Sequence, residues 1–229
     1  MRPILLSDVA SPNPSSIIDA TDGFRSTKKK TRRLRRTFAE RILVALDRLD
    51  RAGTAEAVSV LLRVNRGNVA RCLSQLTANG TLARDAAHLR PGEDRGRPAT
   101  LYFRPEVQLN SIHIKVRYLI VSRAIMLMAD SDYRLHQYDP AKGHLEFRHR
   151  KSTKEPALLF VIDDQSEPAD TTFTKLQNAE VYARARGALA AAFVAAPTRI
   201  ARLKVLCEHH SPSSKVIDIW GFGRTTGSS

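Results

Sequence analysis

The feature that most constrains this chain is a succession of three helical patterns in its first half. Apolar residues recur every three or four positions over 38–49, 54–62 and 65–79. This spacing places the apolar side chains of each segment on one face of a helix. Gly53 ends the first segment, and Thr54 and Asn65 are suited to cap the second and third. We therefore expect three short helices that share a core.

The third segment has distinct inner and outer faces. Val69, Leu73 and Leu76 form the predicted inner face. The outer face carries groups that can bind base edges, because Arg can donate two hydrogen bonds to guanine, whereas Asn and Gln pair with adenine. No acidic residue lies between Asn65 and Asp85. The predicted base-reading residues are Arg66, Asn68, Arg71 and Gln75. The alternative is the polar face of a helix that binds only protein.

Two strand-like stretches, 81–89 and 99–103, follow the third helix and flank a loop rich in turn formers. Three helices followed by such a hairpin predict a winged helix-turn-helix. The order of elements, together with the stretch "RGRPATLYF", resembles bacterial winged-helix DNA-binding domains. In that fold the third helix lies in the major groove. The resemblance implies that Arg95 and Arg97, at the tip of the wing, contact phosphates or a minor groove.

The charge of the chain favours a polyanionic partner. The formal net charge is +14, and residues 25–36 hold eight basic residues and no acidic one. Such a segment neutralises phosphates and makes DNA binding depend on salt. The alternatives are a solvated tail and a segment attracted to anionic lipid. The predicted phosphate contacts are Lys28, Lys29, Lys30, Arg32 and Arg33.

The second half alternates helices and strands. A long helix is predicted over 110–130, with an apolar stripe made of Ile114, Tyr118, Val121, Ile125 and Met128. Further strands are predicted at 133–137, 144–148, 157–163, 189–195 and 215–220, and further helices at 171–186 and 198–209. This alternation predicts an α/β domain. The fold class is α+β, with an arm at 1–36, a winged helix at 37–105, the α/β domain at 106–222 and a tail at 223–229.

Two stretches of the second half, "LLFVIDDQSEPADTTFTKLQNAEVYA" and "FVAAPTRIARLKVL", resemble the C-terminal half of the bacterial replication-relaxation family, to which MobC-type plasmid mobilisation proteins belong. The shared features are a hydrophobic strand that ends in acids, an acidic turn, a helix with Lys and Tyr, and an Arg-containing helix. The resemblance implies a domain like that of restriction endonucleases. It also implies a DNA-binding protein of a plasmid or mobile element, acting in mobilisation, replication or their transcriptional control.

The alternative function is metal-dependent DNA nicking. Restriction-type nucleases hold Mg²⁺ or Mn²⁺ between two acids and place a Lys nearby. Glu146 and Asp163, with Asp164 beside it, are the candidate acids, but Gln165 stands where the Lys is needed. Lys175 would then have to supply the ammonium group. Tyr182 is the candidate nucleophile of a relaxase-like reaction.

If the chain is not a nuclease, the acids bond backbone N–H groups at the strand end. No cofactor or metal site is then expected. The spacing of the two histidine pairs, His144 with His149 and His209 with His210, favours surface positions over metal binding.

The remaining expectations concern location and partners. No stretch is long and apolar enough to span a membrane, and the start lacks the pattern of a signal peptide, so we expect a bacterial cytoplasmic protein. Cys72 and Cys207 have apolar neighbours and are expected to pack in the core. The expected partners are double-stranded DNA, a replication or transfer protein, and a second copy of the chain. The apolar stripe of 110–130 is the candidate surface for the second copy.

Overall fold

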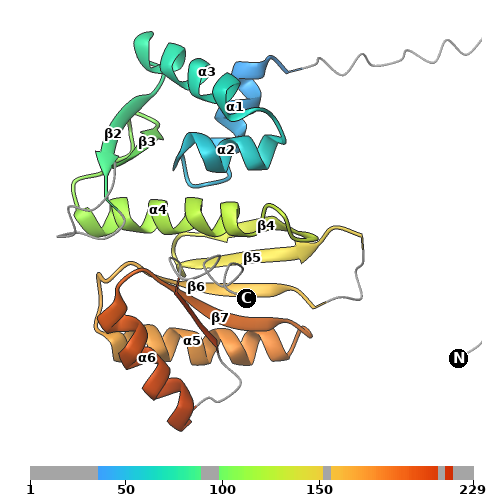
Figure 1. The fold of residues 1–229 in the computed structure, drawn as a ribbon, viewed down its shortest axis with the longest axis vertical. Coiled ribbons are helices and arrows are strands. Elements are labelled where there is room, and N and C mark those ends of the chain that lie inside the picture. Colours follow the sequence, from blue (N-terminus) through green and yellow to red (C-terminus); the bar gives the residue numbers. More distant parts are fainter. Residues whose placement is uncertain (1–35, 89–97, 152–155, 211–214, 219–229) are drawn as a thin grey trace, which may run out of the picture. The chain divides into compact units, whose positions relative to one another are not determined.

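The computed structural model describes residues 36–88, 98–151, 156–210 and 215–218. The described residues form six helices and two sheets, as an α+β chain requires (Figure 1). The first elements are α1 (Phe38–Asp47), β1 (Ala52–Gly53), α2 (Ala55–Leu62), α3 (Arg66–Ala78), β2 (Ala83–Ala87) and β3 (Ala99–Phe103). They are followed by α4 (Ile112–Leu127), β4 (Tyr133–Asp139), β5 (His144–His149), β6 (Leu158–Asp163), α5 (Ala169–Arg184), β7 (Leu189–Val194), α6 (Pro197–His210) and β8 (Lys215–Asp218).

Local capping determines where the first helices begin. Thr37 and Glu40 form a reciprocal capping box at the start of α1. Thr54 accepts a hydrogen bond from the Ala57 amide and so caps α2, as the sequence predicts. The helices pack around a core that includes Ile42, Leu46, Val58, Val69 and Leu73.

Strand β1 was not predicted from the sequence. The first helix ends at Asp47 rather than continuing toward Gly53, because Asp50 and Arg51 adopt positive φ angles of 57° and 68°. The next two residues pair with β3, with Ala52 opposite Phe103. The result is a three-stranded antiparallel sheet with the order β1-β3-β2.

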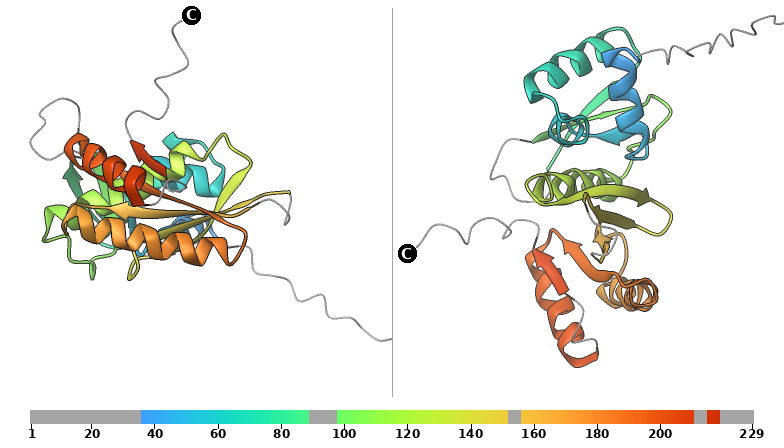
Figure 2. Two further views of the ribbon diagram at one scale, coloured as in Figure 1. Left: turned by 90° about the horizontal axis from the view of Figure 1, so that it is seen from below. Right: turned by 90° about the vertical axis from the view of Figure 1, so that its right-hand side faces the viewer.

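The second sheet has five strands in the order β4-β5-β6-β7-β8. The pairs β4–β5 and β5–β6 are antiparallel, whereas β6, β7 and β8 run parallel to one another. Helix α4 covers one face of this sheet, and α5 and α6 cover the other (Figure 2). Both faces of the parallel strands are therefore buried, as parallel sheets require.

The central strand β6 contributes alternate side chains to the hydrophobic cores on the two faces of the sheet. Phe160 and Ile162 belong to the core that contains α4, whereas Leu159 and Val161 belong to the core under α5 and α6. On the α4 face, Phe160 stacks on Phe193 of β7, with ring centroids 4.2 Å apart. This alternation sends Asp163 and Asp164, at the end of the strand, toward opposite faces.

Helix α4 is buried far more widely than its predicted stripe. Tyr118, Val121 and Ile125 of that stripe are buried, but so are Leu119 and Ile120 from other parts of its circumference. The helix packs on α2 and β1 as well as on the five-stranded sheet. The stripe therefore lies inside the chain and is not the surface for a second copy that the sequence suggested.

Polar contacts also join α4 to the first elements. The Tyr118 hydroxyl donates to Asp50, and burial followed by the Asp50 charge raises the pKa of Tyr118. Ser122 Oγ accepts a hydrogen bond of 3.3 Å from the Thr54 amide. Both bonds connect segments 68 residues apart, so α4 belongs to the core of the first elements as much as to that of the sheet.

Two smaller expectations concern cysteines and the membrane. Cys207 is buried in the core under α5 and α6, Cys72 is half-buried beside the core of the first helices, and both are free thiols. The expected core packing is therefore confirmed for Cys207. Among the described residues, no helix combines the length and the apolar character needed to cross a bilayer.

Candidate nucleic-acid interface and the acidic end of β6

Helix α3 has one buried face and one exposed face. Asn65 caps the N-terminus of the helix, because its side-chain oxygen accepts a 2.7 Å hydrogen bond from the Gly67 amide. Val69, Leu73 and Leu76 are buried among α1 and α2. The predicted inner face is confirmed, so the outer face is also the one expected from the sequence.

The exposed face of α3 carries three of the predicted base-reading side chains. Asn68, Arg71 and Gln75 are all exposed and recur at a spacing of three and four residues, which places them on one side of the helix. None of them makes a side-chain hydrogen bond or ion pair within the described part of the chain. Their donors and acceptors are available to a ligand.

Arg66 differs from the other three residues because it already has a partner. Its Nη2 lies 2.6 Å from Oε1 of Glu56 in the first turn of α2. The Arg66 side chain is nevertheless 69% exposed, and an exposed pair of this kind contributes at most about 1 kcal/mol. A phosphate or a base could therefore replace Glu56, but the replacement reduces what Arg66 contributes to binding.

Part of the predicted interface lies outside the described residues. This applies to Lys28, Lys29, Lys30, Arg32 and Arg33 and to the wing residues Arg95 and Arg97. These assignments stay predictions. Arg84 of β2 is a further exposed basic residue, and the alternation of exposed and less exposed positions along 83–87 could have indicated its exposure from the sequence.

The acids at the carboxyl end of β6 are buried and bonded. Arg199 of α6 donates from Nη2 to Oδ1 of Asp163 at 2.6 Å and from Nε to Oδ2 at 2.9 Å. Thr172 of α5 adds a third hydrogen bond to the same carboxylate, 3.2 Å long. The hydrogen bonds from Arg199 to Asp163 raise the pKa of Arg199, although burial opposes this. The Asp163 side chain is only 1% exposed, so its oxygens are not open to solvent.

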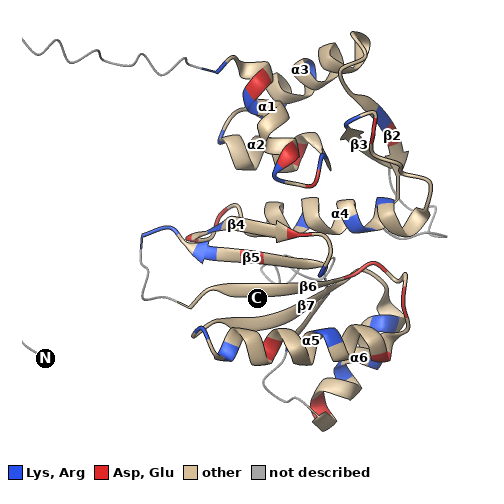
Figure 3. Cartoon of the chain, turned by 180° about the vertical axis from the view of Figure 1, so that it is seen from behind, with Lys and Arg blue, Asp and Glu red and all other residues tan. Residues whose placement is uncertain are grey.

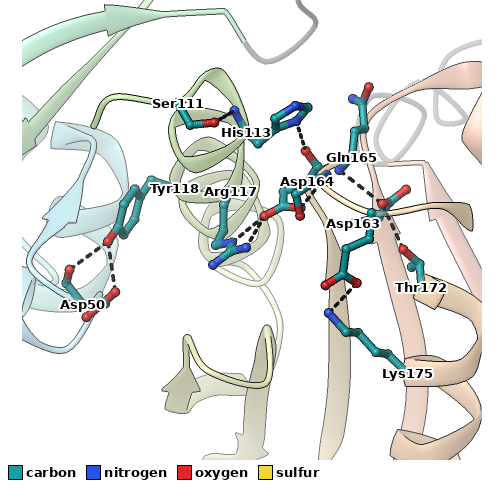
Figure 4. A network of polar contacts seen from close by, with 12 residues as sticks. Asp50, Ser111, His113, Arg117, Tyr118, Asp163, Asp164, Gln165, Thr172 and Lys175 are labelled. Atoms are coloured by element: carbon teal, nitrogen blue, oxygen red, sulfur yellow. Dashed lines mark hydrogen bonds and ion pairs between the residues drawn. The ribbon is translucent and has the colours of Figure 1, made fainter. Parts of the chain in front are cut away.

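Asp164 points toward the other face of the sheet, where Arg117 of α4 pairs with its Oδ2 (Figure 4). Ser166 donates to Oδ1 from both its amide and its hydroxyl group. His113 Nδ1 lies 3.1 Å from the Asp164 carbonyl oxygen. Burial opposes ionisation of Asp164, but the bonds from Ser166 and Arg117 outweigh it and lower the pKa of the carboxyl group.

This pair of acids therefore connects elements of the fold. Asp163 joins β6 to α5 and α6, and Asp164 joins it to α4. The connection from β6 to α5, red in Figure 3, also carries Glu167, which pairs with Lys175. Asp170, in the first turn of α5, pairs with Arg202. Neutralised acids in such a network have a structural role.

The two acids of the predicted metal site are not brought together. Glu146 lies opposite Leu159 in the β5–β6 register, and Asp163 is four residues further along β6. At 3.3 Å per residue this separates them by about 13 Å along the strand, too far to share one cation. Glu146 instead pairs with Arg148, at 2.6 Å.

The other two predicted catalytic residues do not complete a site either. Lys175 Nζ lies 2.6 Å from Glu167, beside a cavity of about 110 Å³ that Arg117 and Asp164 also line. Tyr182 is seven residues beyond Lys175, about 10 Å along the helix, and the Arg186 guanidinium covers its ring at 4.1 Å. Within the described ranges, no group of three or more His, Cys, Asp or Glu residues is placed to hold a metal ion.

Comparison with protein-family models, with curated proteins and with solved structures gave no match for this chain.

Proposed function

We propose that this chain is a double-stranded DNA-binding protein that inserts α3 into the major groove. The observation that carries the proposal is the exposed face of α3, on which Asn68, Arg71 and Gln75 stand together without partners in the described chain. These side chains match the donor and acceptor patterns of adenine and guanine. The burial of the opposite face fixes the orientation of the helix.

The order of elements supports a winged helix-turn-helix. Three helices precede the β2–β3 hairpin, and β1 adds a short third strand beside β3. In that fold the third helix reads the groove and the hairpin approaches the backbone. The basic segment 25–36 would then neutralise phosphates on either side of the site.

The second half supports the resemblance to the replication-relaxation family. A helix, three antiparallel strands, a helix and a parallel strand succeed one another from α4 to β7, an order in keeping with a restriction-endonuclease-like domain. We infer a role in mobilisation, replication or transcriptional control of a plasmid or other mobile element in the bacterial cytoplasm. In that role α3 supplies the DNA address, and the α/β half recruits a replication or transfer protein.

The geometry gives less support to the DNA-nicking alternative. The distance between Glu146 and Asp163 and the saturation of Asp163 by Arg199 leave no shared metal site among the predicted residues. The α/β half is accordingly proposed as a scaffold and docking module.

The test begins with selection of duplexes from a random pool by the full chain, followed by fluorescence anisotropy on the selected sequence. Arg71→Ala should weaken binding to that sequence by about 1–3 kcal/mol and relax the base preference at one position. Arg186→Ala, an equal change of charge just beyond the end of α5, is the matched control and should leave affinity within twofold. Equal effects of the two substitutions would argue against groove binding by α3.

A further inference from the structure

A second, larger cavity lies where α2, the end of α4 and strands β4 and β5 meet. Its volume is about 400 Å³. Four arginines from four different segments line it: Arg48, Arg63, Arg134 and Arg150. His136 lines it too, and no acidic residue does so within the described part of the chain. The cavity is thus strongly cationic and lies apart from the outer face of α3.

The four arginines have no carboxylate partner in the part of the chain that the structure describes. Among the described residues, no Asp or Glu lies within ion-pair distance of any of them, whereas Arg66, Arg117 and Arg199 each have a carboxylate partner. Guanidinium groups gathered around one space repel one another. An anion that enters the cavity would relieve this repulsion and gain several charge-assisted hydrogen bonds.

Two of the arginines are held in place by backbone carbonyls. Arg48 donates from Nη2 to the Leu135 oxygen at 2.9 Å, and Arg150 donates from Nη2 to the Ala129 oxygen at 3.2 Å. The Nε of Arg150 is buried and has no hydrogen-bond partner in the described chain. A buried donor of this kind is costly when it is left unsatisfied, so this N–H group is suited to an acceptor that enters the cavity.

The rest of the wall is apolar. Ile125 of α4, Met128 just after its end, Leu135 of β4 and Phe147 of β5 contribute to it. A volume of about 400 Å³ lies in the range of small-molecule sites, roughly 300–1,000 Å³, and exceeds what a bare phosphate fills. The planar fork of Arg matches phosphate oxygens in pairs. The ligand that suits both surfaces carries phosphate at one end and a flat apolar group at the other.

We propose that this cavity binds an organic phosphate of about the size of a mononucleotide. The phosphate groups lie among the arginines, and the ring lies on the apolar wall. The proposal does not depend on DNA binding by α3. Because the cavity is lined by α2 as well as by the five-stranded sheet, a bound ligand would contact both the helix that precedes α3 and the second half of the chain.

The experiment is isothermal titration calorimetry of the full chain with ADP, pyrophosphate and adenosine at low salt. Pyrophosphate should bind because it supplies the charge, and ADP should bind at least severalfold more tightly because its base covers the apolar wall. Adenosine should bind at least tenfold more weakly than ADP. The proposal would be overturned if neither ADP nor pyrophosphate bound. It would also be overturned if adenosine bound as tightly as ADP.

Two variants place the binding in this cavity. Arg134→Glu reverses a charge at an exposed position on β4 and should weaken ADP binding at least tenfold. Lys204→Glu makes the same change of charge on α6, which covers the other face of the sheet, and should leave ADP binding within twofold. Equal losses in both variants would mean that only net charge matters. If Arg134→Glu lost duplex binding and the native chain did not bind ADP, the arginines would be assigned to DNA phosphates. That result would also overturn the proposal.

Discussion

Arg199 grips Asp163 with two hydrogen bonds, of 2.6 and 2.9 Å, and so ties the first turn of α6 to the carboxyl end of β6. The two side chains are 16% and 1% exposed. Removing one member of such a buried pair leaves an uncompensated charge, which costs far more than the loss of a surface pair. This contact is therefore expected to support the whole layer formed by α5 and α6.

Arg199→Ala should lower the free energy of unfolding by about 3–5 kcal/mol, because the Asp163 carboxylate would stay buried without its cation. Arg202 lies on the same helix as Arg199 and forms an exposed ion pair with Asp170 of α5. Arg202→Ala removes this pair and should lower the free energy of unfolding by less than about 1 kcal/mol. Urea denaturation followed by circular dichroism measures both values. Similar losses of unfolding free energy in the two variants would show that the buried pair stabilises the fold no more than the exposed pair does.

The pKa of Asp164 is lowered in the folded chain, so its ionised form stabilises the fold. A group with a depressed folded-state pKa contributes its full stabilisation above its unfolded pKa, near 3.9, and loses that contribution as the pH falls toward the folded-state pKa. The stability of the native chain should therefore fall more steeply below about pH 4.5 than that of Asp164→Asn. Asp170→Asn is the control.

Urea unfolding of the three proteins at several pH values between 7 and 3 provides the measurement. The curve of Asp170→Asn should run parallel to that of the native chain, because the Asp170 carboxylate is exposed. If Asp164→Asn also ran parallel, the hydrogen bonds from Ser166 and Arg117 would not favour the ionised carboxylate as described.

Glu56 lies 2.6 Å from Arg66, so under the proposed function it would compete with DNA for that guanidinium. Glu56→Gln should strengthen duplex binding up to about fivefold at low salt, the equivalent of a surface ion pair worth less than about 1 kcal/mol. Glu106→Gln, which removes a more exposed acid paired with Arg51, is the control. Fluorescence anisotropy over a salt series measures the change, and an equal gain in both variants would attribute it to overall charge alone.

Supercoiled plasmid incubated with the chain and Mg²⁺ or Mn²⁺ should stay intact while the same samples show a gel shift. The physical reason is the register of β5 and β6, which keeps Glu146 about 13 Å from Asp163 along the strand. Metal-dependent nicking that disappears in Glu146→Gln would contradict this expectation and restore the nuclease hypothesis.

The inner and outer faces of α3 could be predicted because they depend on neighbours three and four residues away. The caps at Thr54 and Asn65 are equally local, and both were expected. The same reasoning placed every strand of the five-stranded sheet near its observed position. It missed β1, because two residues carry no periodicity and their pairing partners, Phe103 and Tyr102, lie 51 and 49 residues further along the chain.

Long-range register decided the rest of the candidate site. The sequence alone could name Glu146, Asp163, Lys175 and Tyr182, but not whether they meet. The pairing of Asp164 with Arg117 joins residues 47 positions apart, and no local pattern signals it. Helix α4 is buried on several sides because it packs on the first elements and on the five-stranded sheet. A single apolar stripe therefore underestimated how much of this helix is buried.

The sequence by itself therefore determined the order of the elements, the orientation of α3 and the basic character of the chain, because these follow from local spacing and composition. Only the tertiary structure decided that Arg199 and Arg117 neutralise the acids at the end of β6, and that four arginines without a carboxylate partner in the described part of the chain surround one cavity. The physical reason is that charges separated along the chain interact according to distance in space, and packing of the helices on the two faces of the five-stranded sheet sets that distance.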